Sequence, residues 1–187
     1  MTQRFELLET PLKGLHLIQR RVVSDERGFF QRLFCEEELA MFGWPAPVAQ
    51  INHTLTRQRG SIRGLHMQLA PHSEAKLITC LRGEVWDVAV DLRAGSPTFL
   101  HWHAVHLEAE KSCSYLIPAG FAHGFQTLSD DVEMLYCHSH PYVPESEFGL
   151  HAMDPRLAIR WPLAVTQHSD KDSAFPFIDQ DFQGITV

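Results

Sequence analysis

The chain has 187 residues, a length that fits one domain with a sizeable core. Its net charge of −7 argues against a general binder of nucleic acid or of anionic membranes, but leaves room for a local basic pocket that binds a phosphorylated small molecule. The N-terminus lacks the apolar core of a signal peptide, and no apolar run reaches the ~18 residues of a membrane helix. The four cysteines show no Cys-x-x-Cys spacing, which favours reduced thiols, so we expect a cytoplasmic protein.

Short apolar-rich segments, bounded by Gly, Pro, Asp or Ser, recur along the chain about every ten residues. They predict strands at 14–23, 29–34, 48–56, 63–68, 76–80, 84–91, 98–107, 114–117, 125–128, 133–138 and 158–161. Residues 35–42 and 154–158 predict two short helices, and the chain from about 154 onward reads as an irregular tail. We therefore expect one all-β domain over residues 1–187, built as a sandwich or barrel with short peripheral helices.

Residues 61–91 combine strand patterning with an unusual density of polar side chains. Strict alternation places His66 and Gln68 on one face of their strand. Lys76 opens the next strand, and Asp87 shares a face with Val85 and other inward residues of the strand after it. Facing strands of this kind predict a concave sheet that carries a base, an amine and a carboxylate, which is a site rather than a core.

Residues 118–125, Pro-Ala-Gly-Phe-Ala-His-Gly-Phe, fit the Pro-x-Gly-x-x-His pattern of the second motif of cupin barrels. The turn at Pro118 would direct His123 into the barrel. A lone His of this kind is more often a core residue bonded to backbone, but His66 lies in the matching first motif and favours a shared site. The fold prediction is therefore a cupin-type jelly-roll barrel.

Metal-binding cupins carry His-x-His and then a Glu in the first motif. Here that stretch reads His66-Met67-Gln68, and Lys76 falls near the place of the acid. An ammonium group repels a divalent cation, so we expect neither a metal nor another cofactor in the barrel. His101, His103 and His106 could hold an ion, although an outward polar strand explains them better.

Taken together, the motifs resemble those of the dTDP-4-dehydrorhamnose 3,5-epimerases, the nucleotide-sugar epimerase branch of the cupins, from about residue 11 to residue 172. The stretches that carry the resemblance are residues 25–30, 50–53, 63–68, 76–77, 83–91, 96–99 and 117–125, with Tyr136 and residues 171–172. Each stretch is weak alone, but their order and spacing form a specific signal.

The resemblance implies proton transfer at the carbons beside a 4-keto group, whose C–H bonds the carbonyl acidifies. His66 would be the base, oriented by Asp172. Lys76 would stabilise the enolate, and Tyr136 would return a proton from the opposite face of the ring. A buried structural tyrosine is the alternative for Tyr136. Asp87 would be a second carboxylate of the substrate cavity, able to contact His66 as well.

The resemblance also implies residues that bind the nucleotide. Arg63 and His123 would hold the diphosphate, with Gln50 and Asn52 beside them. Arg27 would help hold the nucleotide, often from the neighbouring subunit, because the family forms homodimers. The expected partner is a nucleotide-diphosphate sugar, with dTDP-4-keto-6-deoxyglucose as the leading substrate.

Some positions depart from the family pattern, mainly among those that would contact the nucleotide. Arg32 stands where a Glu is usual, Pro141 replaces the first of two tyrosines, and Cys137–His140 replaces small hydroxyl residues. Two alternatives stay open. One is an epimerase of C3 or C5 alone, or a ketoisomerase, acting on another nucleotide sugar. The other is a non-catalytic or metal-dependent cupin.

Overall fold

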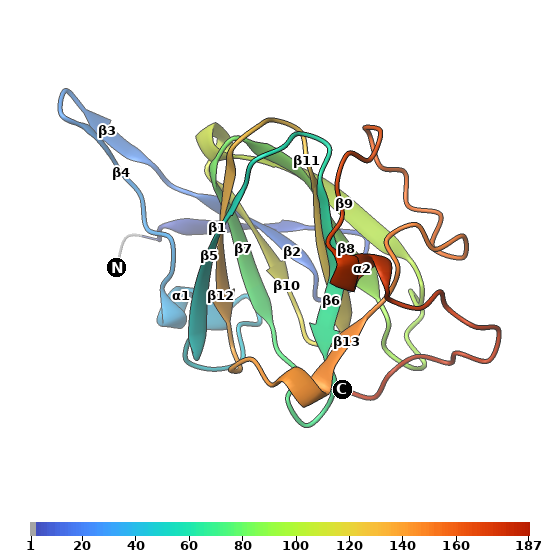
Figure 1. Cartoon of the computed structure of the whole chain (residues 1–187). Helices are drawn as coiled ribbons and strands as arrows, with labels where there is room; N and C mark the ends of the chain where they lie inside the picture. Colours follow the sequence, from blue (N-terminus) through green and yellow to red (C-terminus); the bar gives the residue numbers. More distant parts are fainter. Residues whose placement is uncertain (1–2) are drawn as a thin grey trace.

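Two antiparallel sheets face each other and form a jelly-roll barrel in the computed structural model, which describes residues 3–187 (Figure 1). The first sheet, in spatial order, contains β1 (Phe5–Glu9), β2 (His16–Arg20), β10 (Cys113–Ile117), β7 (Lys76–Arg82), β12 (Val132–His138) and β5 (Gln50–Thr56). The second contains β13 (Glu147–Gly149), β6 (Ile62–Gln68), β11 (Phe121–Thr127), β8 (Glu84–Asp91) and β9 (Trp102–Glu108). The all-β jelly-roll prediction is confirmed.

The remaining elements are short and lie around this barrel. A separate hairpin pairs β3 (Val23–Asp25) with β4 (Gly28–Phe30) and projects away from both sheets (Figure 1). The helices are α1 (Glu36–Ala40), α2 (Asp170–Ser173) and the 3₁₀ turns η1 (Ala109–Lys111) and η2 (Pro144–Ser146). Within residues 3–187, no helix has the length and apolar character needed to cross a membrane.

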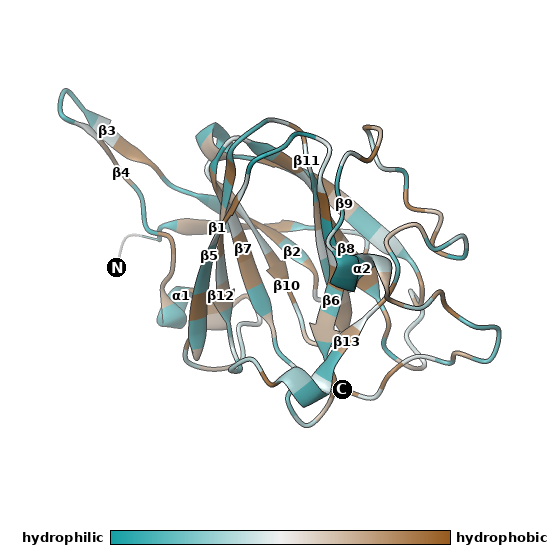
Figure 2. Cartoon of the chain, viewed as in Figure 1, coloured by the Kyte–Doolittle hydropathy of each residue, from teal (hydrophilic) through white to brown (hydrophobic). Residues whose placement is uncertain are grey.

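The core is divided by the sheets into an inner cluster and two outer ones. Along β8, Val85 and Ala89 pack between the sheets, while Val88 and Val90 pack on the outer face, as the alternation predicted. The outer face of the second sheet is covered by apolar side chains of the tail, including Ile178. Figure 2 shows hydrophobic residues along the strands of both sheets, and hydrophilic residues in α2. Burial of apolar side chains in these three clusters therefore stabilises the barrel and holds the tail against it.

Several predicted elements differ in the structure. The strand prediction over 98–107 holds only from Trp102, and the one over 29–34 shrinks to β4. Residues 154–158 form turns instead of a helix, and residues 158–161 form no strand. Leu157, Ile159 and Trp161 pack against the cluster on the outer face of the second sheet, although their backbone is irregular. This packing explains why the apolar residues resemble a strand pattern. The strands β1, β3 and β13, and helix α2, were not predicted.

Strands β6 and β11 approach closely at two glycines, and this local irregularity shapes the site. A Cβ atom on Gly64 would lie 2.6 Å from Gly124 Cα, and Gly64 has φ +114°. The register of β11 against β6 shifts between His123 and Phe125. Because the bulge interrupts the alternation at Gly64, Arg63 lines the same cavity as His66 despite their opposite parity.

Candidate active site

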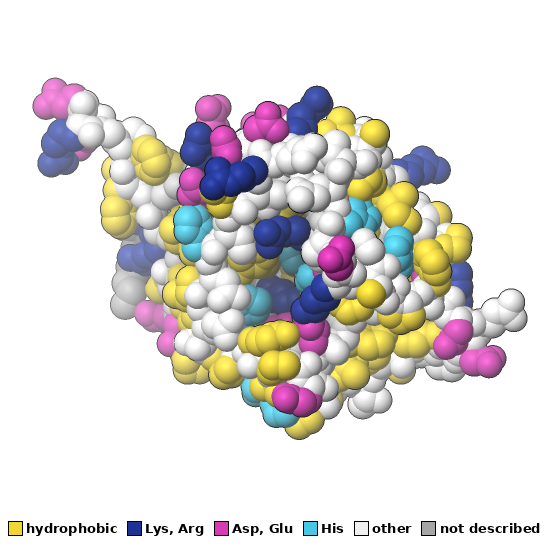
Figure 3. All heavy atoms as spheres, in the orientation of Figure 1, with side chains coloured by type: hydrophobic (Ala, Val, Ile, Leu, Met, Phe, Trp, Pro, Cys, Tyr) yellow, Lys and Arg dark blue, Asp and Glu magenta, His cyan; other side chains and the backbone are white. Residues whose placement is uncertain are grey.

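A cavity of about 670 Å³ opens between the two sheets. Figure 3 shows Lys, Arg and His side chains gathered around the hollow on this face of the molecule. Most of the sequence-predicted site residues line it: Gln50, Asn52, Arg63, His66, Lys76, His123, Tyr136 and Asp172. The barrel thus brings together side chains from β5, β6, β7, β11, β12 and α2.

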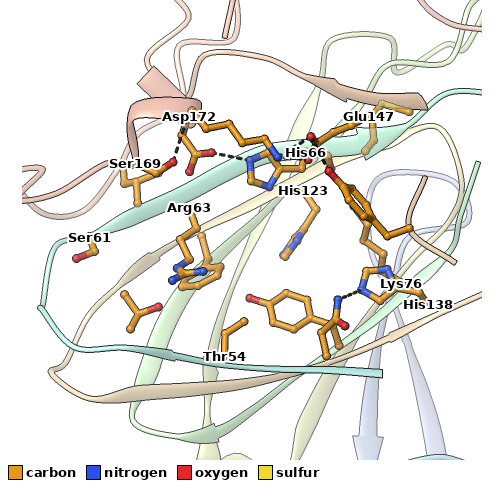
Figure 4. Close-up of a pocket in the computed structure, with 18 of the residues that line it drawn as sticks. Thr54, Ser61, Arg63, His66, Lys76, His123, His138, Glu147, Ser169 and Asp172 are labelled. Atoms are coloured by element: carbon orange, nitrogen blue, oxygen red, sulfur yellow. Dashed lines mark hydrogen bonds and ion pairs between the residues drawn. The ribbon is translucent and has the colours of Figure 1, made fainter. Parts of the chain in front are cut away.

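His66 and Asp172 form a hydrogen-bonded pair at the wall of the cavity (Figure 4). His66 Nε2 lies 2.7 Å from Asp172 Oδ1, and the Gly64 N–H donates to Asp172 Oδ2 at 3.2 Å. Burial would raise the pKa of Asp172, but the hydrogen bonds and charge of His66 lower it overall, so the carboxylate stays ionised at neutral pH. It therefore fixes the His66 proton on Nε2 and leaves Nδ1 free to accept a proton.

The segment that carries Asp172 is held by two further contacts. Ser169 caps α2, and its Oγ accepts a hydrogen bond of 3.0 Å from the Asp172 N–H. The Phe175 ring lies edge-on to His66, with ring centroids 5.4 Å apart, and it covers Gly149 so closely that a Cβ there would meet the ring at 2.3 Å. These contacts place the carboxylate of a short helix against a strand far away in the sequence.

Lys76 is buried and already has two partners on the protein. Its Nζ donates to the His66 carbonyl oxygen at 2.9 Å and lies 3.0 Å from Glu74 Oε1. The second carboxylate oxygen, Glu74 Oε2, is buried without a hydrogen-bond partner. Sequence reasoning missed Glu74, although it precedes Lys76 by two residues and so could have been placed on the same face.

A second His–carboxylate pair lies deeper in the barrel. His123 Nε2 is 2.8 Å from Asp87 Oδ1, so Asp87 pairs with His123 and not with His66. Asp87 is fully buried behind His123 and does not line the cavity. Burial raises the pKa of Asp87, whereas His123 and Lys76 oppose the shift.

Tyr136 lines the cavity between two imidazole rings. Its ring stands edge-on to His123 and is stacked with His138, with centroids 6.2 Å apart in each case. Burial raises the pKa of Tyr136 well above its usual value, although the nearby Thr54 hydroxyl opposes the shift. Burial and the charge of Lys76 lower the pKa of His138 to about 4. At neutral pH the phenol is therefore protonated and able to donate, and His138 is uncharged.

The polar residues of β5 form a chain that reaches His138. The Tyr142 N–H donates to Gln50 Oε1 at 2.9 Å, Gln50 Nε2 donates to Asn52 Oδ1 at 3.0 Å, and Asn52 Nδ2 lies 3.4 Å from His138 Nε2. Arg63 lines the same cavity, and among the residues drawn in Figure 4 its guanidinium has no hydrogen-bond or ion-pair partner. Its donors are thus available to an anion.

Arg27, like Asp87, is a predicted site residue that does not line the cavity of its own chain. It lies at the tip of the β3–β4 hairpin, where its side chain is 84% exposed and pairs with Asp25 at 2.5 Å. The hairpin also exposes Phe29 and Phe30, which are 69% and 59% exposed. An exposed apolar hairpin of this kind is typical of a segment that packs on another surface.

Lys171, Glu147 and Tyr142 form a polar group on the cavity wall that sequence reasoning did not assign. Lys171 Nζ lies 2.7 Å from Glu147 Oε1, and the Tyr142 hydroxyl donates to Glu147 Oε2 at 3.1 Å. The hydrogen bond to Glu147 raises the pKa of Lys171. The position of Lys171 directly before Asp172 was the one signal that could have indicated it.

The histidines of β9 are bonded to side chains of neighbouring strands. His103 Nδ1 lies 2.8 Å from the Tyr115 hydroxyl, and His106 Nε2 lies 2.7 Å from Glu84 Oε2. Across the described part of the chain, no group of three or more His, Cys, Asp or Glu residues is arranged to hold a metal ion. The expectation of a reaction without metal or cofactor stays a prediction.

Comparisons with known proteins agree with this arrangement. A family model described as dTDP-4-dehydrorhamnose 3,5-epimerase matches residues 9–180. A dTDP-4-dehydrorhamnose 3,5-epimerase of Shigella flexneri is 39% identical over 178 residues, covering 94% of this chain and 98% of the relative.

Two solved structures extend the similarity to the fold. A 3,5-epimerase from Legionella pneumophila in complex with dTDP-4-keto-L-rhamnose gives a TM-score of 0.90 at 39% identity, covering 98% of this chain and 99% of that one. A 3′-monoepimerase from Streptomyces bikiniensis, in complex with dTDP-quinovose, gives 0.84 at 35% identity, covering 90% and 85%. The chain thus belongs to the dTDP-4-dehydrorhamnose 3,5-epimerase family, as its motifs indicated.

Proposed function

We propose that this protein is an isomerase that inverts C3 and C5 of dTDP-4-keto-6-deoxyglucose and so forms dTDP-4-keto-rhamnose. The single observation that carries the proposal is the His66–Asp172 pair, 2.7 Å apart, on the wall of a cavity that Lys76 and Tyr136 also line. Family membership and the similar structure with dTDP-4-keto-L-rhamnose bound support the choice of substrate.

The chemistry follows from the charges of these groups. His66 Nδ1 takes the proton from a carbon beside the ketone, and the C–H electron pair moves into the carbonyl to form an enolate. Lys76 donates a hydrogen bond to the enolate oxygen. Tyr136 then donates its phenolic proton to the opposite face of the same carbon, which inverts the centre. The phenolate takes a proton from solvent and His66 Nδ1 releases its proton to solvent, which restores both groups for the next inversion.

The nucleotide end of the substrate needs donors, and the free guanidinium of Arg63 supplies them to the diphosphate. Gln50 and Asn52 extend the polar wall from β5. We assign Arg27 to the same task in the neighbouring subunit, because its hairpin projects away from both sheets and contributes no residue to the lining of the cavity in its own chain. The protein then works as a homodimer of single cupin-type domains. We place it in the cytoplasm, where a reducing environment keeps cysteines such as the four free ones here as thiols.

The proposal is tested by incubating the protein with dTDP-4-keto-6-deoxyglucose in heavy water and following deuterium by NMR. We expect uptake at both C3 and C5, with inverted configuration at each. His66→Ala should abolish both, because one base serves both carbons, whereas His106→Ala, which alters a histidine outside the cavity, should not.

The same experiment separates the alternatives. Uptake at one carbon only would indicate a monoepimerase, the activity of the similar Streptomyces bikiniensis protein. Saturable binding without deuterium uptake would indicate a non-catalytic sugar-nucleotide-binding protein. Retained uptake at either carbon in His66→Ala would contradict the assignment of the base.

A further inference from the structure

Lys76 and its neighbour Glu74 each have a polar atom that can still form a hydrogen bond with a ligand, and these atoms indicate which ligand the site binds. We propose that Glu74 is a substrate-binding residue that accepts a hydrogen bond from the sugar hydroxyl next to the ketone, and so makes the enzyme specific for an α-hydroxy ketone. This inference rests on the proposed function and assigns a group that the proposed proton transfers do not use.

Lys76 can donate three hydrogen bonds, since an ammonium group carries three N–H bonds and no acceptor. One N–H donates to the His66 carbonyl oxygen at 2.9 Å, and Nζ also forms an ion pair with Glu74 Oε1 at 3.0 Å. At least one N–H remains for a ligand in the cavity that Lys76 lines. Because Glu74 balances its charge, Lys76 acts on the substrate as a directed donor and not as a free cation.

Glu74, in contrast, has an acceptor oxygen that lacks a hydrogen-bond donor within residues 3–187. Its side chain is only 4% exposed and lines the cavity, and Oε2 has no hydrogen-bond partner among the described residues. A buried carboxylate oxygen without a donor is costly, so it should be satisfied when the cavity is filled. The donor that it needs is a neutral hydroxyl, because the neighbouring ammonium already supplies the positive charge.

Together, Lys76 and Glu74 offer one donor and one acceptor from residues two apart on the chain. A ketone oxygen accepts from the donor, and a hydroxyl on the adjacent carbon donates to the acceptor. In a 4-keto-6-deoxyhexose that hydroxyl is on C3, since C5 bears the methyl group and the ring oxygen. Lys76 and Glu74 would therefore bind the C4 ketone and the C3 hydroxyl at the same time.

The test is a competition between two substrates in heavy water. One is dTDP-4-keto-6-deoxyglucose, and the other is its 3-deoxy analogue, which lacks only the C3 hydroxyl and keeps the C5 proton. The ratio of deuterium uptake at C5 gives the ratio of the two kcat/KM values. That ratio does not depend on how much enzyme is folded, and a general disturbance of Lys76 slows both substrates alike.

We expect the wild-type enzyme to favour the hydroxylated substrate by about tenfold to a hundredfold, the usual size of a hydrogen bond to a charged group. Glu74→Gln, which keeps the shape but replaces an acceptor oxygen by an amide nitrogen, should lower this preference by about tenfold. Glu110→Gln, on the exposed turn η1, should leave it unchanged.

An unchanged preference in Glu74→Gln, or no preference in the wild-type enzyme, would overturn the assignment of Glu74 while leaving the epimerase intact. Absence of uptake from either substrate with the wild-type enzyme would instead refute the proposed function, and with it the inference.

Discussion

At the scale of single residues, the two aspartates of the site have pKa values that are shifted in opposite directions by their surroundings. Asp172 accepts hydrogen bonds from His66 and from a backbone N–H, and its pKa is lowered. Asp87 is fully buried, and its pKa is raised. Tyr136 remains a phenol for the same reason. An ionised partner for the base and a protonated acid can therefore coexist at neutral pH.

Replacing Tyr136 by Phe should keep proton removal by His66 but lose productive proton return, because the variant lacks the only hydroxyl assigned to the opposite face. We expect exchange to persist while C5-inverted product falls by about 10²–10⁴-fold, the usual contribution of a general acid. NMR of the product mixture in heavy water measures both quantities. Tyr115→Phe, which removes a hydroxyl bonded to His103 outside the cavity, is the matched control. Unchanged product composition in Tyr136→Phe would rule out this role.

The residues of the site could be predicted from the sequence to different degrees. Alternation alone placed His66 on the inner face, but it would have placed Arg63 on the outer one. The motif resemblance gave Arg63 correctly as a cavity residue, and the bulge at Gly64 gives the physical reason. Glu74 was missed because its importance depends on an unpaired oxygen, which only a three-dimensional hydrogen-bond pattern reveals.

At the scale of elements, α2 has little intrinsic stability, since four residues are far shorter than an isolated helix needs. Its Ser169 cap and the packing of Phe175 on Gly149 hold it in place. Periodicity did not predict the structure of the tail, because its apolar side chains pack against the outer face of the second sheet without a regular spacing in the sequence. It therefore predicted a helix at 154–158 and a strand at 158–161, and neither is present.

The β3–β4 hairpin should be a contact between subunits. Replacing Phe29 and Phe30 together by Ser should convert the proposed dimer to monomers and weaken nucleotide-sugar binding, because Arg27 then no longer reaches the second cavity. Sedimentation velocity measures the first effect, and KM for the sugar nucleotide the second. Phe177→Ser, which alters an exposed Phe of the tail, is the control that should change neither. A wild-type protein that sediments as a monomer, or a double variant that remains dimeric, would contradict this role.

At the scale of the whole molecule, the predicted strands were sufficient to indicate the barrel. They did not indicate the segments that pack on the outside of its two sheets. The predicted strands from 48 to 138 correspond to β5 through β12, so the two sheets were accessible from local patterning. The N-terminal α1 region covers part of one sheet and the tail covers the other. These layers depend on contacts between residues far apart in the sequence, which periodicity does not encode.

Asp91 should make the stability of the molecule depend on pH in the acid range. Burial would raise the pKa of Asp91, but hydrogen bonds from Arg93, Ser96 and Thr98 lower it to about 2. Because this value is below that of an unfolded Asp, about 3.9, the ionised group stabilises the fold above about pH 4. This contribution is lost as the pH falls from about 4 to about 2.

Asp91→Asn should accordingly lower the free energy of unfolding by on the order of 2 kcal/mol at pH 7 and flatten the decline between pH 4 and pH 2. Urea unfolding at a series of pH values measures both effects. Asp181→Asn, which changes an exposed carboxylate of the tail, should leave the profile as it is. An Asp91→Asn profile parallel to that of the wild-type protein would show that Asp91 does not cause the acid dependence.

The bond between His66 and Asp172 joins residues 106 positions apart, and Asp172 follows every strand of the barrel in the sequence. During synthesis, every strand of the barrel leaves the ribosome before that carboxylate does. A growing chain can therefore enclose its cavity while the imidazole still lacks the partner that sets its tautomer. We therefore expect turnover only after translation has passed residue 172 and the segment that carries Asp172 has docked, so a chain that stops earlier should be inactive.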